Sequence, residues 1–321
     1  MTRFLGLRGS RLNWVALIGV TMPAIMTFGY HTSLLGGVLT LNSFDRQFPE
    51  IDVTDVHADP EVIRRKSTIQ GTVVGLFAVG GLFGALFCIG LGDIFGRRRV
   101  IMVASMVQLV GAVLMSSAFD FAQLVVSRVI VGLGTGGLLA TVPIWQSEIS
   151  TAGNRGSHVA TTGAFAGVGA TLTLFVDLGM SFAPGSIAWR LPFAFPILLL
   201  LSVMGFIALL PESPRWLLRQ GRAAEAREIL AALEDVSTNS PKVQTEIEEV
   251  QLSLTLVGNG SLSQIFRTGP QRVFHRTMLS IVTMIFVQLT GVAVITFYSM
   301  FSSWKTGHLA LTHPSFSQHR F

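Results

Sequence analysis

Long apolar runs separated by polar segments dominate the hydrophobic pattern of this chain. A membrane-spanning helix needs about 20 mostly apolar residues, and seven stretches of the sequence meet that requirement. Half of the 321 residues are hydrophobic and 13% are charged, which is about half the charged share of a soluble domain. The pattern predicts an all-α membrane protein. The expected spans are Trp14–Leu39, Ile69–Leu91, Val100–Ala118, Phe121–Ile144, His158–Phe182, Pro192–Leu210 and Met278–Phe301.

Basic residues gather at one side of these spans. Arginines precede the first span, and more lie in segments 92–99 and 211–276, whereas segment 42–68 is rich in acids despite a basic cluster at 64–66. Because cytoplasmic loops carry an excess of Lys and Arg, we expect a multi-pass protein, in the plasma membrane, with a cytoplasmic N-terminus. The expected parts are a cytoplasmic N-terminus (1–13), a six-helix half (14–210), a cytoplasmic linker (211–276), a seventh helix (277–301) and an unrelated polar tail (302–321).

The linker after the sixth span contains signals for short helices. Ser213 can cap a helix whose first residue is Pro214, since proline lacks the amide proton that this position leaves unpaired. Residues 223–233 are good helix formers with apolar positions on one side. We therefore expect short cytoplasmic helices in this loop.

Several other classes of function are disfavoured by the sequence. The net charge of +5 reflects arginines at span ends rather than a basic stripe, so we expect no nucleic-acid partner. Gly132, Gly134 and Gly137 fit the G-x-G-x-x-G spacing, but they lie inside an apolar run and not after a strand, which favours close helix packing. Cys88 stands alone, no spacing of metal ligands is present and no catalytic constellation is visible, so we expect no metal, cofactor or enzyme activity.

Six short motifs lie in a fixed order along the chain. The most specific directly follows the sixth span and reads P-E-S-P-R-W-L at 211–217. Each motif alone is weak, but six in register are a strong signal. The others are G-D-I-F-G-R-R-R at 92–99, R-V-I-V-G-L-G at 128–134, P-I-W-Q-S-E at 143–148 with R-G at 155–156, W-R-L-P at 189–192 and Q-L-T-G at 288–291.

Together these motifs resemble the sugar porter family of the major facilitator superfamily, in a fungal-like form. The resemblance covers about residues 14–301 and implies that the chain holds the N-terminal six-helix bundle and a seventh helix of a twelve-helix carrier. Such a carrier moves a sugar or polyol-like solute through the lipid bilayer by alternating access. By match to the family, a cytoplasmic gating network would be formed by Asp93, Arg97, Arg98, Glu148, Arg155, Glu212 and Arg215. For Arg99 and Arg219 we prefer the interpretation of solvated loop charges.

Two polar residues inside predicted spans are candidates for proton coupling. Charged groups inside a bilayer are costly and mostly functional, which draws attention to His31 and Arg128. In proton-coupled relatives an aspartate takes the place of His31. A neutral imidazole beside Arg128 would be tolerated, whereas a second cation would not. The open alternatives are a proton relay through His31, a uniporter, and a histidine that only packs against a backbone carbonyl.

The seventh span carries the expected substrate contacts. The resemblance assigns this role to Gln288, Thr290 and Tyr298, with amide and hydroxyl groups that can bind sugar hydroxyls. Four polar contacts usual in the family are replaced here. The departures favour a less hydroxylated, larger or more apolar solute over a plain hexose. The replacing residues are Val287, Ala293, Gly163 and Trp145, and Phe297 stands where the family has a further tyrosine.

The family pattern ends at about Phe301, and the remaining residues are polar. Since alternating access needs a second half, we expect this C-terminally truncated chain to be inactive as a carrier by itself. A seven-helix nutrient sensor or receptor is an alternative, although such receptors have an external N-terminus. A regulatory fragment that pairs with intact carriers is another.

Overall fold

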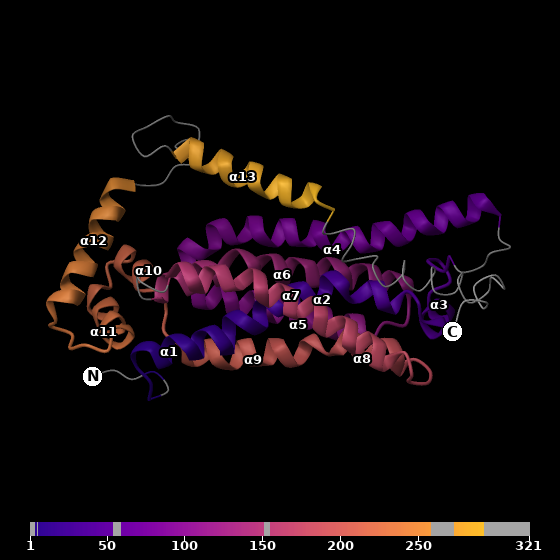
Figure 1. Cartoon of the computed structure of the whole chain (residues 1–321), viewed down its shortest axis with the longest axis horizontal. Coiled ribbons are helices and arrows are strands. Elements are labelled where there is room, and N and C mark those ends of the chain that lie inside the picture. The colour runs from indigo at the N-terminus through magenta and orange to yellow at the C-terminus, as the bar shows by residue number, and fades with distance from the viewer. Residues whose placement is uncertain (1–3, 5, 54–58, 151–154, 258–272, 292–321) are drawn as a thin grey trace, which may run out of the picture.

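The computed structural model describes residues 4, 6–53, 59–150, 155–257 and 273–291. These residues form helices joined by short connections (Figure 1). The all-α expectation is confirmed. The elements are α1 (Gly9–Ala16), a π-helical segment η1 (Leu17–Thr21), α2 (Met22–Val38), α3 (Asn42–Gln47), α4 (Pro60–Phe95), α5 (Arg97–Ser116), α6 (Phe121–Ile149), α7 (Arg155–Met180), α8 (Ile187–Ala194), α9 (Pro196–Leu209), α10 (Pro214–Arg219), α11 (Ala223–Leu233), α12 (Pro241–Val257) and α13 (Val273–Leu289).

Six helical segments in the described part of the chain are long and apolar enough to cross a membrane. They correspond in order to the first six predicted spans, with α1, η1 and α2 forming one span, and α8 and α9 another. The largest departure is the second span, which begins nine residues before its predicted start. Asp59 caps this helix by accepting a hydrogen bond from the amide of Glu61, and Pro60 occupies its first turn. The basic cluster at 64–66 therefore lies on α4, a helix of 36 residues, and not in a loop.

Close contacts of small residues hold α4 against α6. A Cβ atom built on Gly84 would lie 2.0 Å from the carbonyl oxygen of Leu133, and one on Gly132 would lie 2.2 Å from that of Phe77. Only glycine permits backbones to approach so closely, which is a common way for helices to pack in lipid. The predicted packing role is seen for Gly132 and also for Gly134, where a Cβ atom would lie 2.5 Å from the backbone nitrogen of Gln108 on α5, whereas Gly75 faces open space in the described structure.

The apolar interior of the bundle is divided between its two ends. One cluster includes Trp145 and Leu210 and joins the membrane helices to α10, α11 and α12. The other surrounds Trp189 and Phe193, where aromatic rings pack edge to face. Each cluster fixes one end of the bundle independently of the helical hydrogen bonds.

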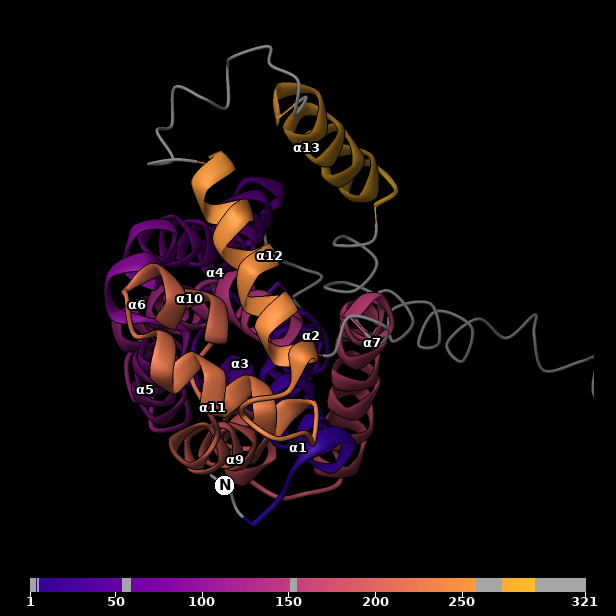
Figure 2. The ribbon, with the colours of Figure 1, turned by 90° about the vertical axis from the view of Figure 1, so that its left-hand side faces the viewer.

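The helices α10, α11 and α12 lie together at the end of the bundle that also holds the described N-terminal residues (Figure 1). Figure 2 looks onto this end and shows α11 and α12 lying across it. The predicted cap is present, since Ser213 Oγ accepts a hydrogen bond from the amide of Trp216 at 3.2 Å. The predicted helix at 223–233 is α11.

The seventh predicted span is described only in its first part. Helix α13 covers Val273–Leu289 and is apolar, but it is exposed along most of its length. The rest of the predicted span, up to residue 301, and the tail at 302–321 lie outside the described residues.

Candidate functional site

A sharp turn at Gly96 begins the polar network at the end of the bundle near α10. Gly96 has φ 88°, in the region that favours glycine, and it separates α4 from α5. A Cβ atom there would lie 2.6 Å from Glu212 Oε2. The turn therefore needs glycine both for its backbone conformation and for the approach of Glu212.

Arg97, the first residue of α5, is the centre of this network. Its Nε and Nη2 atoms donate to the two carboxylate oxygens of Glu148 at 3.0 and 3.3 Å. Its Nη1 atom donates to Asp93 Oδ1 at 3.1 Å and to the carbonyl oxygen of Gly92 at 2.7 Å. The side chains of Arg97 and Glu148 are only 15% and 9% exposed. Such a two-pronged, mostly buried pair is among the strong charged contacts of proteins, and it joins α4, α5 and α6.

Asp93 extends the network to α10. Its Oδ2 atom forms an ion pair with Arg219 Nη1 at 2.7 Å. Its carbonyl oxygen accepts a hydrogen bond from the indole of Trp216 at 3.0 Å. Partial burial works to raise the pKa of Asp93, but its bonds to Arg219 and Arg97 outweigh that effect and hold the pKa below its ordinary value.

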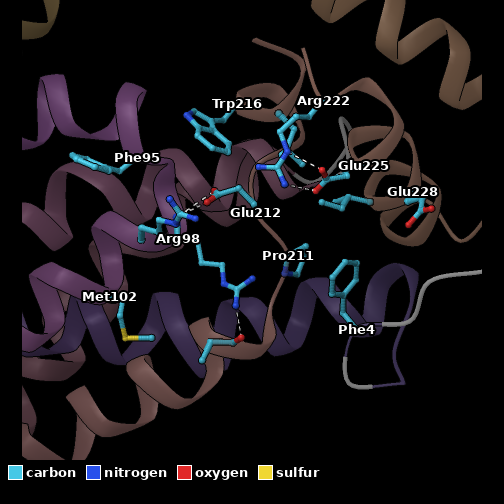
Figure 3. Close-up of a pocket in the computed structure, with 14 residues that line it drawn as sticks. Phe4, Phe95, Arg98, Met102, Pro211, Glu212, Trp216, Arg222, Glu225 and Glu228 are labelled. Atoms are coloured by element: carbon cyan, nitrogen blue, oxygen red, sulfur yellow. Dashed lines mark hydrogen bonds and ion pairs between the residues drawn. The ribbon is translucent and has the colours of Figure 1, made fainter. Parts of the chain in front are cut away.

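Glu212 binds the start of α5 through backbone groups rather than through a side-chain cation. Its carboxylate accepts hydrogen bonds from the amides of Arg97 at 3.1 Å, Arg98 at 3.2 Å and Ser213 at 2.9 Å. Figure 3 shows this carboxylate pointing at the start of α5. Burial raises the pKa of Glu212, against these three donors. Glu212 thus satisfies amides at the start of a helix that would otherwise lack partners.

The remaining predicted network residues take different places. The guanidinium of Arg98 donates to the carbonyl oxygen of Ala208, which ties α5 to α9 (Figure 3). Arg215 is exposed and donates to Ser253 Oγ at 3.1 Å on α12. Arg219, interpreted from the sequence as a solvated charge, instead pairs with Asp93, so that interpretation is wrong. The side chain of Arg155 lies outside the described part.

Sequence reasoning also missed a link from α6 to the P-E-S-P-R motif. Trp145 is fully buried, and its indole N–H donates to the carbonyl oxygen of Pro211 at 3.2 Å. From the sequence, Trp145 stands out only as a residue that replaces a tyrosine of the family pattern. A buried indole N–H needs an acceptor, and this requirement was the available signal. The structure brings together Asp93, Arg97, Glu148, Glu212 and Arg219, and we call this set the cytoplasmic network after the side of the membrane that the sequence predicts for it.

His31 and Arg128 are both fully buried in the middle of the bundle. The His31 ring lies 5.9 Å from the ring of Phe77, and the guanidinium of Arg128 lies 5.7 Å from the ring centre of Phe193. Within the described residues neither side chain has a hydrogen-bond partner. A backbone-bonded histidine, one alternative from the sequence, is therefore not what the described structure contains.

The predicted substrate residues are only partly described. Gln288 and Thr290 are exposed at the C-terminal end of α13, and Thr290 Oγ1 donates to the carbonyl oxygen of Val287 at 2.6 Å. Tyr298 lies outside the described residues. In the described part no group of three His, Cys, Asp or Glu side chains is placed to hold a metal ion.

Comparison with known proteins identifies the family. Residues 15–304 match the family described as Sugar (and other) transporter. This chain belongs to that family. It is 32% identical over 300 residues to Sugar transporter STL1 of Saccharomyces cerevisiae, a match that covers 92% of this chain and 52% of that protein. It is 31% identical over 300 residues to MFS-type transporter oryC of Aspergillus oryzae, with 92% of this chain and 53% of that protein covered.

A solved structure shows the same fold. The proton:xylose symporter XylE from E. coli, bound to 6-bromo-6-deoxy-D-glucose, aligns with a TM-score of 0.74 at 20% identity. The alignment covers 89% of this chain and 61% of XylE. This chain is thus a multi-pass membrane protein with the N-terminal six-helix bundle of the major facilitator fold. It spans about half the length of the curated relatives it matches.

Proposed function

We propose that this chain provides the N-terminal bundle of a membrane carrier that moves a sugar or polyol-like solute by alternating access. The observation that carries the proposal is the cytoplasmic network, which joins four helices through partly buried ion pairs at one end of the bundle. Membership of the Sugar (and other) transporter family supports the class of solute. The relatives described above include a sugar transporter and a proton:xylose symporter, which is consistent with the proposal.

In this mechanism the cytoplasmic network keeps the inner end of the bundle closed while the solute site faces outward. Arg97 and Asp93 hold the inner ends of α4, α5 and α6 against α10. The same pairs can separate on inward opening because water solvates the released charges, and exposed pairs such as Arg219 with Asp93 cost little to break. The more buried pair of Arg97 with Glu148 would be the last to open.

The central polar groups supply a candidate pathway for protons. His31 and Arg128 are buried in the bilayer region without hydrogen-bond partners in the described structure, an arrangement that bundles retain mainly for function. We assign the proton-coupling role to this pair and the solute contacts to Gln288, Thr290 and Tyr298. We also propose that the N-terminus lies in the cytoplasm and that the carrier lies in the plasma membrane.

The direct test uses purified residues 1–321 in liposomes, with radiolabelled xylose and glycerol as probes. For these 321 residues alone we expect saturable binding without net uptake, because alternating access needs two halves that move against each other. Saturable uptake would support the carrier function and show that these residues carry it out themselves, and size-exclusion chromatography would then show whether they do so as an oligomer. Absence of both binding and uptake for every sugar and polyol tested would refute the proposal.

A topology test is independent of transport. A cysteine placed at Ser10, with Cys88 changed to serine, should react with an impermeant maleimide only after the plasma membrane is opened. Labelling from the outside of intact cells would refute the cytoplasmic N-terminus. Labelling confined to an internal membrane fraction would refute the plasma-membrane assignment.

A further inference from the structure

A carboxyl group lies buried in the bundle at the end opposite the cytoplasmic network. Asp177 on α7 is three residues from the end of that helix and is 4% exposed. Neither of its oxygens has a hydrogen-bond partner among the described residues. The apolar segments 9–38, 60–88, 97–116, 121–149, 156–180 and 187–209 contain two other acids, Glu61 and Glu148. Glu61 is exposed in the first turn of α4 and Glu148 is paired with Arg97, so Asp177 alone is buried and unpaired there.

Asp177 lies where α7 packs against α2. A Cβ atom on Gly37 would lie 2.2 Å from Asp177 Oδ2 and 2.6 Å from its Cβ. One turn earlier, Thr173 Oγ1 donates to the carbonyl oxygen of Tyr30 at 3.0 Å and fixes the register of the two helices. The carboxyl group therefore occupies space that exists because Gly37 has no side chain.

Asp177 also lines a cavity of about 720 Å³ at the outer end of the bundle. Few charged or titratable groups lie near the Asp177 carboxyl group. Arg46 on α3 lines the same cavity, but no ion pair joins it to Asp177 in the described structure. Tyr30 on α2 is the other, and its hydroxyl already donates to the carbonyl oxygen of Pro192 at 3.0 Å. Helix α8 contributes the uncharged Ala188. The remaining polar lining consists of Thr40, Asn42, Ser43 and Ser181.

We propose that Asp177 is a proton-binding residue of this carrier, loaded from the outer cavity. In the loading step a hydronium ion in the cavity gives its proton to a carboxylate oxygen of Asp177, an O–H bond forms, and water is left. No electrons are transferred. A charged carboxylate without a partner is costly to bury, and the proton removes that charge. The inference rests on the proposed carrier function and adds to it an acid that the His31 and Arg128 pair lacks.

The location links proton binding to the outer opening. When Asp177 is charged, water in the cavity must solvate it, so the outer ends of α2 and α7 stay accessible. When Asp177 is neutral, the cavity can lose its water and the two helices can close over it. Proton loading would thus favour closure on the outer side, which is the direction needed for inward delivery of a proton with a solute.

Infrared spectroscopy tests proton binding without any need for transport. The purified 321-residue chain in lipid is titrated over a series of pH values, and the carbonyl stretch of a protonated carboxylic acid is followed. We expect one such band to disappear in Asp177→Asn and to shift in Asp177→Glu. Asp120→Asn removes an exposed acid at the same end of the bundle and should leave the band unchanged.

A second pair of variants tests the site rather than the acid. Gly37→Ala crowds the carboxyl group and should move the pH at which the band appears, whereas Gly179→Ala on α7 meets open space and should not. An Asp177→Asn spectrum identical to that of the parent at every pH would overturn the proposal. So would a site that sodium fills, seen as a sodium-dependent change in the carboxylate band without a protonated form. If the band is lost in Asp177→Asn but the parent chain binds no solute, the proton site is supported and the carrier function is refuted.

Discussion

Removing either partner of the Arg97 and Glu148 pair should have unequal effects on stability. In the described part of the chain Glu148 has Arg97 as its partner, and its side chain is 9% exposed. Arg97 has Asp93 and the carbonyl oxygen of Gly92 as well. Arg97→Gln therefore leaves a buried carboxylate without a counter-ion, whereas Glu148→Gln leaves an arginine that is still paired.

The expected sizes follow from this asymmetry. Removing one member of a buried ion pair so that the other charge has no counter-ion costs about 3 kcal/mol. Losing one charge-assisted hydrogen bond while the shape is kept costs about 1–2 kcal/mol. The double variant also removes the carboxylate that Arg97→Gln leaves unpaired, so it should cost less than Arg97→Gln alone, about 2 kcal/mol, and the coupling energy should be about 2–3 kcal/mol.

The measurement is a double-mutant cycle in mixed micelles, with helix content followed by circular dichroism as the fraction of denaturing detergent rises. The exposed pair of Arg222 with Glu225 supplies the control, and Arg222→Gln should leave the unfolding midpoint unchanged. If the two single costs are equal and simply add in the double variant, the pair is not the buried link described above.

Three further outcomes are expected. Gly132→Ala should lower the unfolding free energy by about 1–3 kcal/mol, because its Cβ would meet a carbonyl oxygen of α4 at 2.2 Å, while Gly75→Ala should be neutral in the same detergent titration. Burial, and secondly the nearby Asp52, raises the pKa of Asp45 from 3.8 to about 7. The stability that comes from keeping this carboxyl group neutral is full below pH 3.8 and is lost as the pH rises through about 7. Asp45→Asn should therefore make the midpoint of thermal unfolding less dependent on pH over that range. Trp145→Phe removes the hydrogen bond to Pro211 and should cost about 1 kcal/mol, with fluorescence of the remaining tryptophans reporting the unfolding.

Local signals were read correctly from the sequence. The cap at Ser213 and the helix at 223–233 depend on neighbouring residues alone, and both are present. The first six spans depend on hydrophobic length and were also found in order. The start of α4 was missed because its first turns are polar and a criterion of apolar length takes no account of the cap at Asp59.

Partners across the fold could not be predicted in the same way. Arg215 and Arg219 lie four residues apart on the same short helix and have the same chemistry. Arg219 reaches Asp93 while Arg215 reaches Ser253, because the packing of α10 against α4 and α12 decides which residue meets which. The burial of Asp177 has a similar origin, since only the tertiary fit of α7 against Gly37 shows that its carboxyl group is buried.

The length of α4 has a mechanical consequence. At about 1.5 Å per residue, its 36 residues extend about 54 Å, whereas the hydrocarbon core of a bilayer is about 30 Å thick. The polar start of the helix, with its cluster of basic residues at 64–66, must then project as a rigid arm above the lipid. Any tilt of the bundle swings the tip of that arm through a wider arc than the buried part, so a fluorophore on it would report small rocking movements as large displacements.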